Sequence, residues 1–307
     1  MKFYVGVTND EWFHYLAALK PDEVNFWRPR NQNDFRLLPV GAPFLFKLHS
    51  PLNFIVGGGF FVRHTFLPID LMWQAFGDCN GTPNLGVLRK RILEHRNPDE
   101  LGRQIGCTIL GQPFFFPRED WIPVPPSWSP NIVTGKSYES TTGDGAKLWV
   151  EVQDRLAHDK SEREQFQHLL EDERRYGSLV SVRPRLGQGG FRILVTDAYN
   201  RRCSITGEKT LPVLEAAHIR PYAENGPHSV SNGLLLRSDW HQLFDAGYIT
   251  VTPQHRVEVS RRIREEFSNG REYYAYDGQS LKVIPEDKQD LPSSEFLEWH
   301  RSERFLR

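Results

Sequence analysis

Two short apolar runs decide the fold of the C-terminal part of the chain: LEAAHIRP at residues 214–221 and SNGLLL at residues 231–236. The first run ends at His218 and is stopped by a proline, which fixes φ and has no N–H group to donate. Asn, Gly and Pro at residues 225–227 form a turn signal between the two runs. After the second run, residues 238–245 begin with Ser-Asp, a pair that can cap a helix. The sequence therefore predicts the order strand, loop, strand, helix.

Three polar residues hold fixed places in this order. His218 ends the first expected strand, Asn232 follows it by 14 residues, and His241 follows Asn232 by nine on the expected helix. This order and spacing strongly resemble the HNH, or ββα-metal, nuclease family. The resemblance implies that His218 is the general base, that Asn232 orders the loop and positions the histidine, and that His241 binds a divalent metal ion.

The chemistry of phosphodiester hydrolysis agrees with these residue types. An imidazole that titrates near neutrality can take a proton from the attacking water. The transition state and the departing 3′-oxygen gain negative charge, which a divalent metal ion stabilises as a Lewis acid. An amide such as that of Asn232 can fix the orientation of the imidazole without competing for the proton. We therefore expect hydrolysis of phosphodiester bonds in double-stranded DNA.

One position departs from the common pattern of the family. Many members have Asp or His directly before the base as a second metal ligand, where this chain has Ala217. Glu215 lies two residues earlier on the same strand face, and Asp245 lies one helical turn after His241. Either carboxylate can complete the site, and we favour Asp245 because the family sometimes places a ligand at that offset. We expect Mg²⁺, with Mn²⁺, Ni²⁺ or Zn²⁺ as alternatives.

The resemblance covers about a third of the chain, residues 183–283. RLGQ at 185–188, FR at 191–192, YNRRC at 199–203 and FDAGYI at 244–249 are similar to the flanks of HNH domains at the C-terminus of restriction endonucleases. The net charge of the chain is −1, but residues 183–220 hold seven basic against three acidic residues. A basic stretch beside the motif suits a phosphate backbone. The expected DNA-binding residues are Arg183, Arg185, Gln188, Arg192 and Arg220.

The length of 307 residues predicts about two domains. We divide the chain into a sensing domain at 1–120, a linker with prolines and charged helices at 121–179, and the nuclease domain at 180–307. The prolines favour a linker because they disfavour both helices and central strands. The expected fold class is α+β, with a mixed, barrel-like N-terminal domain and a C-terminal ββα-metal domain.

Local patterns predict the elements of the first domain. Runs of aromatic and β-branched residues predict strands, and helical periodicity predicts helices. The expected strands are 3–7, 42–47, 54–56 and 60–62, and the expected helices are 10–19, 68–76 and 85–95. Gly57-Gly58-Gly59 predicts a turn or a bulge between two of these strands.

The first domain resembles the PUA-like folds, which include EVE-type and SRA-type readers of modified bases. Such readers flip a base into a pocket and stack it on aromatic side chains. Each aromatic residue of the domain can instead belong to the core, and the sequence leaves this open. The candidates for base reading are Trp12, Trp27, Phe60, Phe61 and Trp73.

Composition excludes several kinds of protein and site. The three cysteines form no CxxC pair, which excludes a four-cysteine zinc site, and we expect Cys203 to be a small buried residue. No signal-peptide pattern and no apolar run near 18 residues occur, so we expect a cytoplasmic protein that does not enter a membrane. His228, on the loop between the two apolar runs, is given no role.

Three functions fit these features. We favour a modification-dependent restriction endonuclease whose first domain reads altered DNA. The alternatives are a defence effector nuclease that a partner protein or small signal activates, and a DNA-binding module with an inactive HNH fold, which Ala217 alone favours. A homodimer would let the enzyme cut both strands, although the sequence shows no dimer interface.

Overall fold

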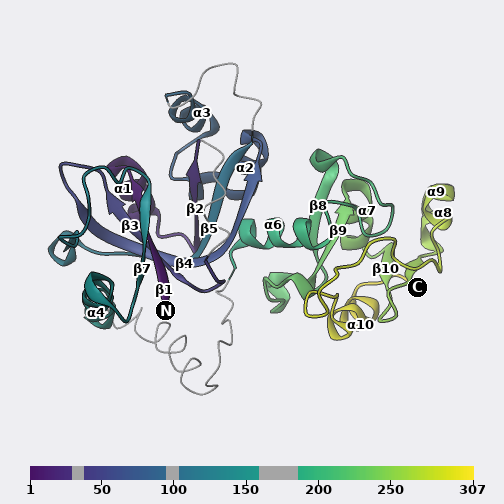
Figure 1. Cartoon of the computed structure of the whole chain (residues 1–307). Helices are drawn as coiled ribbons and strands as arrows, with labels where there is room; N and C mark the ends of the chain where they lie inside the picture. Colours follow the sequence, from purple (N-terminus) through teal and green to yellow (C-terminus); the bar gives the residue numbers. More distant parts are fainter. Residues whose placement is uncertain (30–37, 95–103, 159–185) are drawn as a thin grey trace. The chain divides into compact units, whose positions relative to one another are not determined.

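The computed structural model describes residues 1–29, 38–94, 104–158 and 186–307 (Figure 1). The chain forms two compact units, Met1–Gly190 and Phe191–Arg307. No helix in the described ranges is long and apolar enough to cross a membrane.

A seven-stranded sheet forms the centre of the N-terminal unit. Its order is β2-β5-β4-β3-β1-β7, and β6 pairs with β4. β1 and β3 are parallel, and the other pairs are antiparallel. The strands are β1 (Lys2–Thr8), β2 (Glu23–Arg28), β3 (Pro43–Leu48), β4 (Phe54–Leu67), β5 (Ile105–Phe115), β6 (Ile122–Pro123) and β7 (Gly135–Glu139).

Helix α1 follows β1 and begins where the sequence provides a cap. The Asn9 side chain accepts a hydrogen bond from the Trp12 N–H at 2.7 Å, and two acidic residues occupy the first turn. Trp12, Phe13 and Leu16 bury one face of the helix. The helices and 3₁₀ turns of this unit are α1 (Asp10–Leu19), α2 (Ile69–Phe76), η2 (Gly77–Asn80), α3 (Leu85–Leu93), η4 (Arg118–Asp120), α4 (Gly143–His158) and the start of α6 (Gln188–Ala198).

Strand β4 is one continuous strand of 14 residues rather than two strands joined at the glycines. Its pairing with β5 shifts between Gly58 and Phe60, so the expected bulge is present and the expected turn is not. A Cβ on Gly57 would collide with the backbone of Phe114, which explains the need for glycine there. Neighbouring side chains of β4 point into two separate apolar cores. Val56 and Phe61 lie in one core, and Ile55 and Phe60 lie in the other.

The assignment of residues 121–158 to a linker is wrong. β7 pairs antiparallel with β1, with Phe3 opposite Tyr138, and β6 pairs with β4. Trp128 and Trp149 are buried in the core that contains Phe3. This stretch is therefore part of the N-terminal unit, while residues 159–179 of the expected linker lie outside the described residues.

The start of α6 is anchored on β2 by a buried carboxylate. Glu23 Oε1 accepts a hydrogen bond from Gly189 N–H at 2.6 Å, and Oε2 accepts one from Gly190 N–H at 2.8 Å. A Cβ on either glycine would meet this carboxylate. Burial raises the pKa of Glu23, and the N–H donors of the helix start oppose that shift.

The C-terminal unit has the predicted order of strand, loop, strand, helix. β8 (Leu214–His218) pairs antiparallel with β9 (Gly233–Arg237), which runs directly into α7 (Ser238–Asp245). Trp240 and Phe244 of α7 are fully buried in one core with α6 and both strands. The remaining elements are η5 (Leu211–Val213), η6 (Tyr222–Glu224), η7 (Val230–Asn232), β10 (Ile249–Val251), β11 (Val257–Val259), α8 (Arg262–Phe267), α9 (Arg271–Tyr274) and α10 (Ser294–Glu303).

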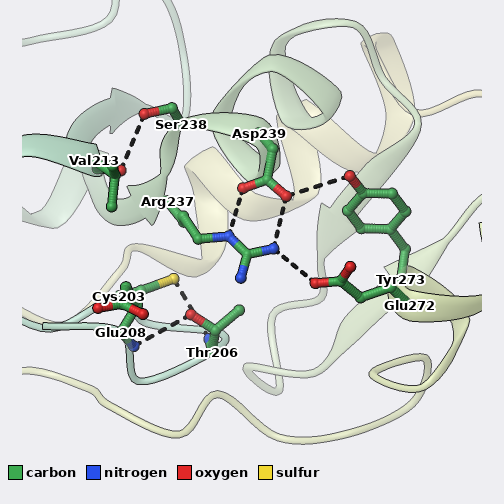
Figure 2. A network of polar contacts seen from close by, with 9 residues as sticks. All are labelled: Cys203, Thr206, Glu208, Val213, Arg237, Ser238, Asp239, Glu272 and Tyr273. Atoms are coloured by element: carbon green, nitrogen blue, oxygen red, sulfur yellow. Dashed lines mark hydrogen bonds and ion pairs between the residues drawn. The ribbon is translucent and has the colours of Figure 1, made fainter. Parts of the chain in front are cut away.

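An ionic network fixes the junction of β9 and α7 (Figure 2). The Arg237 guanidinium donates two hydrogen bonds to Asp239, at 2.6 and 2.8 Å, and a third to Glu272 at 2.8 Å. Tyr273 donates to the same Asp239 carboxylate at 3.2 Å. Cys203 is fully buried nearby, and its Sγ accepts a hydrogen bond from the Thr206 N–H. The contacts of Arg237 with Glu272 and of Tyr273 with Asp239 thus join segments that are distant in the sequence.

Helix α10 is held to the same core by a buried histidine. His300 stacks on Phe244 with ring centroids 3.7 Å apart. Its Nε2–H donates to the Phe244 carbonyl at 3.1 Å, so Nδ1 accepts from the Thr250 hydroxyl at 2.9 Å. Burial lowers the pKa of His300 to about 4, which keeps the ring neutral at physiological pH.

Candidate active site

His218 lies at the C-terminal end of β8 and is half-buried. One face of its ring stacks on Phe191 of α6, with centroids 3.8 Å apart and an angle of 10° between the planes. Opposite His218 in the ladder stands Gly233, where a Cβ would collide with Val195 and crowd the Phe191 ring. Glycine at this place therefore lets α6 approach the two strands and support the imidazole.

The environment of His218 keeps its imidazole neutral. Burial, followed by the neighbouring His228 and His241, lowers its pKa to about 4. Its Nε2 lies 2.9 Å from Nδ1 of His228. Its Nδ1 makes no hydrogen bond with any described residue. A neutral imidazole has one N–H and one lone pair, and the unengaged Nδ1 holds the lone pair that a general base requires when the proton is on Nε2.

His228 is a site residue that the sequence did not indicate. It lies on the loop between β8 and β9, and its ring packs between His218 and Tyr222. The Tyr222 ring stacks on it with centroids 4.7 Å apart and planes at 14°. Only the folded loop brings this histidine to His218, so no sequence spacing could have identified it.

Asn232 is fully buried and orders the loop after β8. Its Oδ1 accepts from the Arg220 N–H at 2.9 Å. Its Nδ2 donates to the carbonyls of Arg220 and Pro227, both at 2.9 Å. No hydrogen bond between Asn232 and His218 side chains occurs in the part of the chain that the structure describes. The amide thus acts on the loop, and any influence on His218 passes through the loop.

Glu215, His241 and Asp245 lie together beside the base. His241 Nδ1 is 2.6 Å from Glu215 Oε2, and its Nε2 is 3.3 Å from Asp245 Oδ2. Strand β8 supplies the first carboxylate, and α7 supplies the imidazole and the second carboxylate one turn later. Desolvation raises the pKa of Asp245, Glu215 adds to that rise, and His241 opposes it.

Carboxylate oxygens and an imidazole nitrogen are suitable ligands for a divalent cation. In the described residues, however, no group of three or more His, Cys, Asp or Glu side chains surrounds a common metal position. Both ring nitrogens of His241 face carboxylates instead. The donor types fit a metal ion.

The expected DNA-binding residues have different surroundings. Arg192 is half-buried, and burial lowers its pKa while Glu215 raises it. Arg220 Nε donates to the Glu224 carbonyl at 2.6 Å, and its guanidinium lies over Trp299. Gln188 is exposed at the first position of α6. Arg183 and Arg185 lie outside the described residues.

Three of the aromatic residues proposed for base reading belong to the core instead. Trp12, Phe60 and Phe61 are 3%, 8% and 5% exposed and pack within the two apolar clusters of the N-terminal unit. Their rings are therefore not available to a flipped base. Trp27 and Trp73 are partly exposed, and the Trp27 Nε1–H donates to the Asn80 carbonyl at 2.8 Å.

The C-terminal residues match a known family. Residues 203–252 match the sequence model of a family described as HNH endonuclease. The C-terminal unit carries an HNH endonuclease domain. The matched segment contains the β8–β9–α7 elements with His218, Asn232 and His241. HNH endonucleases generally use a divalent metal ion.

Solved structures show only low similarity to the chain. Two variants of the ZmASCH protein from Zymomonas mobilis are each 11% identical and cover 50% and 49% of this chain and 99% and 95% of their own, with TM-scores of 0.34 and 0.32. A modification-dependent TagI restriction endonuclease is 14% identical, covers 92% of this chain and 75% of its own, and has a TM-score of 0.28. No curated protein matches the sequence.

Proposed function

We propose that the chain is a metal-dependent DNA endonuclease in which His218 is the general base. The observation that supports this most directly is the state of the His218 imidazole inside the HNH segment. The ring is neutral, is supported by Phe191 and His228, and keeps Nδ1 unengaged by the described residues. A neutral imidazole can take a proton from water at neutral pH, although its lowered pKa makes it a weaker base than a histidine that titrates near neutrality.

In this proposal one group of residues provides the general base and another stabilises the negative charge of the transition state. His218 Nδ1 would take the proton of the water that attacks the phosphorus. Glu215, His241 and Asp245 would hold the divalent ion, which supplies positive charge for the transition state and the departing 3′-oxygen. Asn232 keeps the loop in the shape that places the base. Arg192 and Arg220 lie near these residues and would contact the phosphate backbone.

For the substrate we propose double-stranded DNA, with altered bases read by the N-terminal unit. Trp27 and Trp73 are the aromatic candidates that keep partial exposure. A base reader needs an exposed ring on which a flipped base can stack. The same hypothesis includes a PUA-like, barrel-like fold for this unit. It also includes a homodimer that cuts both strands.

A cleavage assay tests the nuclease. The full chain is incubated with Mg²⁺ or Mn²⁺ and plasmid DNA that is unmodified or carries methyl- or hydroxymethylcytosine. We expect cleavage that EDTA abolishes and that His218→Ala lowers by roughly 100-fold or more. His14→Ala is the matched control, because His14 is an exposed histidine on α1 whose ion pair with Asp10 lies on the surface.

The substrate arms of this assay separate the competing functions. Cleavage restricted to modified DNA supports the modification-dependent enzyme. Cleavage that needs an added partner or small signal supports a defence effector instead. An inactive HNH-fold module is the conclusion if no DNA is cut with any metal ion and His218→Ala behaves as the wild type.

A further inference from the structure

We propose that His228 is a positioning residue that selects the tautomer of His218. This inference deepens the proposed nuclease function and rests on it for its catalytic meaning. The observation is the contact between His218 Nε2 and His228 Nδ1 at 2.9 Å, in a loop pinned by a buried amide. His228 touches the base rather than the reacting atoms, so its effect on the reaction passes through His218.

The contact allows two proton arrangements, and just one leaves His218 active. If Nε2 of His218 carries the proton and donates it, Nδ1 keeps a lone pair that can accept a proton from water. If Nδ1 of His228 donates instead, the Nε2 lone pair of His218 is occupied. The proton of a neutral His218 then sits on Nδ1, and neither nitrogen can act as a base. Catalysis by His218 therefore requires His228 to accept through Nδ1.

The surroundings of His228 hold its ring in the accepting position. Tyr222 stacks on one side at 4.7 Å, and the His218 ring meets it edge-on at 5.0 Å. Phe191, which stacks on His218, also lies 5.8 Å from the His228 ring. Tyr222 is 69% exposed, so it forms the outer end of a row of rings that starts in the core. A ring held on both sides loses little further freedom when it forms the hydrogen bond.

The buried amide of Asn232 completes the chain of contacts. Its Nδ2 donates to the carbonyl of Pro227, the residue directly before His228. The backbone of Ile219, directly after His218, donates to the Asn232 carbonyl at 2.9 Å. Asn232 therefore fixes both histidines through the backbone, and His228 carries the orientation to the His218 ring.

Three variants of the full chain separate the parts of this proposal. His228→Phe keeps an aromatic ring against Tyr222 but removes the acceptor. His228→Asn places an amide oxygen near the position of Nδ1 and restores the acceptor. Tyr222→Ala removes the stack and leaves the acceptor, and Tyr222→Phe is its matched control because it keeps the ring.

The tautomer is measured by ¹⁵N NMR of protein labelled at histidine, with the His218 signals assigned by their loss in His218→Gln. We expect wild-type His218 to be protonated at Nε2, and His228→Phe to shift the proton partly to Nδ1. The same variant should lower kcat by roughly 10- to 100-fold with little change in KM, as for other residues that orient a reacting group. His228→Asn should recover both the tautomer and most of the kcat.

The NMR and kinetic measurements can each contradict the positioning role independently. Wild-type His218 protonated at Nδ1, or a His218 tautomer that His228→Phe leaves unchanged, overturns the positioning role. A wild-type kcat in a folded His228→Phe protein overturns it as well. If no DNA is cut under any condition, the nuclease proposal fails, and the NMR result alone then decides whether His228 sets the tautomer.

Discussion

Replacing Asn232 with Ala should destabilise the C-terminal unit more than any other single amide change beside the site. The side chain is fully buried and makes three hydrogen bonds of 2.9 Å, to the Arg220 N–H, the Arg220 carbonyl and the Pro227 carbonyl. Each such bond contributes about 1 kcal/mol net, and a buried donor left without a partner costs about 1–3 kcal/mol. We expect the free energy of unfolding to fall by about 3–5 kcal/mol.

Urea unfolding of the full chain measures this loss through the fluorescence of tryptophan, since Trp240 is fully buried in the core of the C-terminal unit. Hydrogen exchange of the Arg220 amide gives a local readout, because Asn232 Oδ1 is its acceptor. Ser231→Ala is the matched control, as its hydroxyl makes one contact of 3.1 Å with Ser229. A loss below about 1 kcal/mol for Asn232→Ala, or an unchanged exchange rate at Arg220, would refute the reasoning.

Three further predictions concern the framework of the site. Arg237→Met should lower the free energy of unfolding by about 1–2 kcal/mol in urea, because it breaks three ionic hydrogen bonds, whereas Arg307→Met at the exposed C-terminus should not. Glu23→Gln should cost about 1–3 kcal/mol in the same assay, because the amide cannot accept from both glycine N–H groups; an unchanged stability would contradict the anchor. His300 has its pKa lowered to about 4, so between pH 6.5 and 4 the unfolded state binds more protons and stability falls with falling pH. His300→Gln should flatten that fall by up to about 1.4 kcal/mol per pH unit, measured by urea unfolding at several pH values.

Short-range patterns in the sequence were sufficient for much of the framework. Helix α1 occupies the expected residues 10–19, because its cap, acidic first turn and apolar face are all local. The strand, loop, strand, helix order around His218 follows from apolar runs separated by turn residues. In both cases the residues that determine the element are close together in the chain.

These local patterns could not predict which strands pair when they are distant in the sequence. The prolines at residues 117–130 disfavour central strands, but β7 pairs with β1 at the end of the sheet order, and β6 makes just a two-residue pairing with β4. The aromatic residue type likewise does not reveal whether a side chain is buried. Phe60 and Phe61 were therefore predicted to read bases, whereas they fill two different cores. His228 reaches His218 because Asn232 shapes the loop, and that shape is a property of the folded chain.

The carboxylates around His241 lead to a last prediction about the metal ion. Ala217 has no donor atom in its side chain and is fully buried in the core, and position 217 therefore offers no ligand. Two carboxylates nevertheless flank one imidazole, and desolvation together with the charge of Glu215 raises the pKa of Asp245. A divalent cation would relieve this concentration of negative charge.

Titration with Mn²⁺, followed by calorimetry or by paramagnetic broadening of the His241 NMR signals, tests whether that relief occurs. We expect Glu215→Gln and Asp245→Asn each to weaken binding by roughly 10-fold or more, because each removes one negative charge and one ligand. Glu298→Gln, which removes a charge on the exposed side of α10, should leave binding unchanged and controls for net charge. If both site variants bind Mn²⁺ as tightly as the wild type, the ion is held elsewhere and His241 is paired with these carboxylates for structural reasons alone.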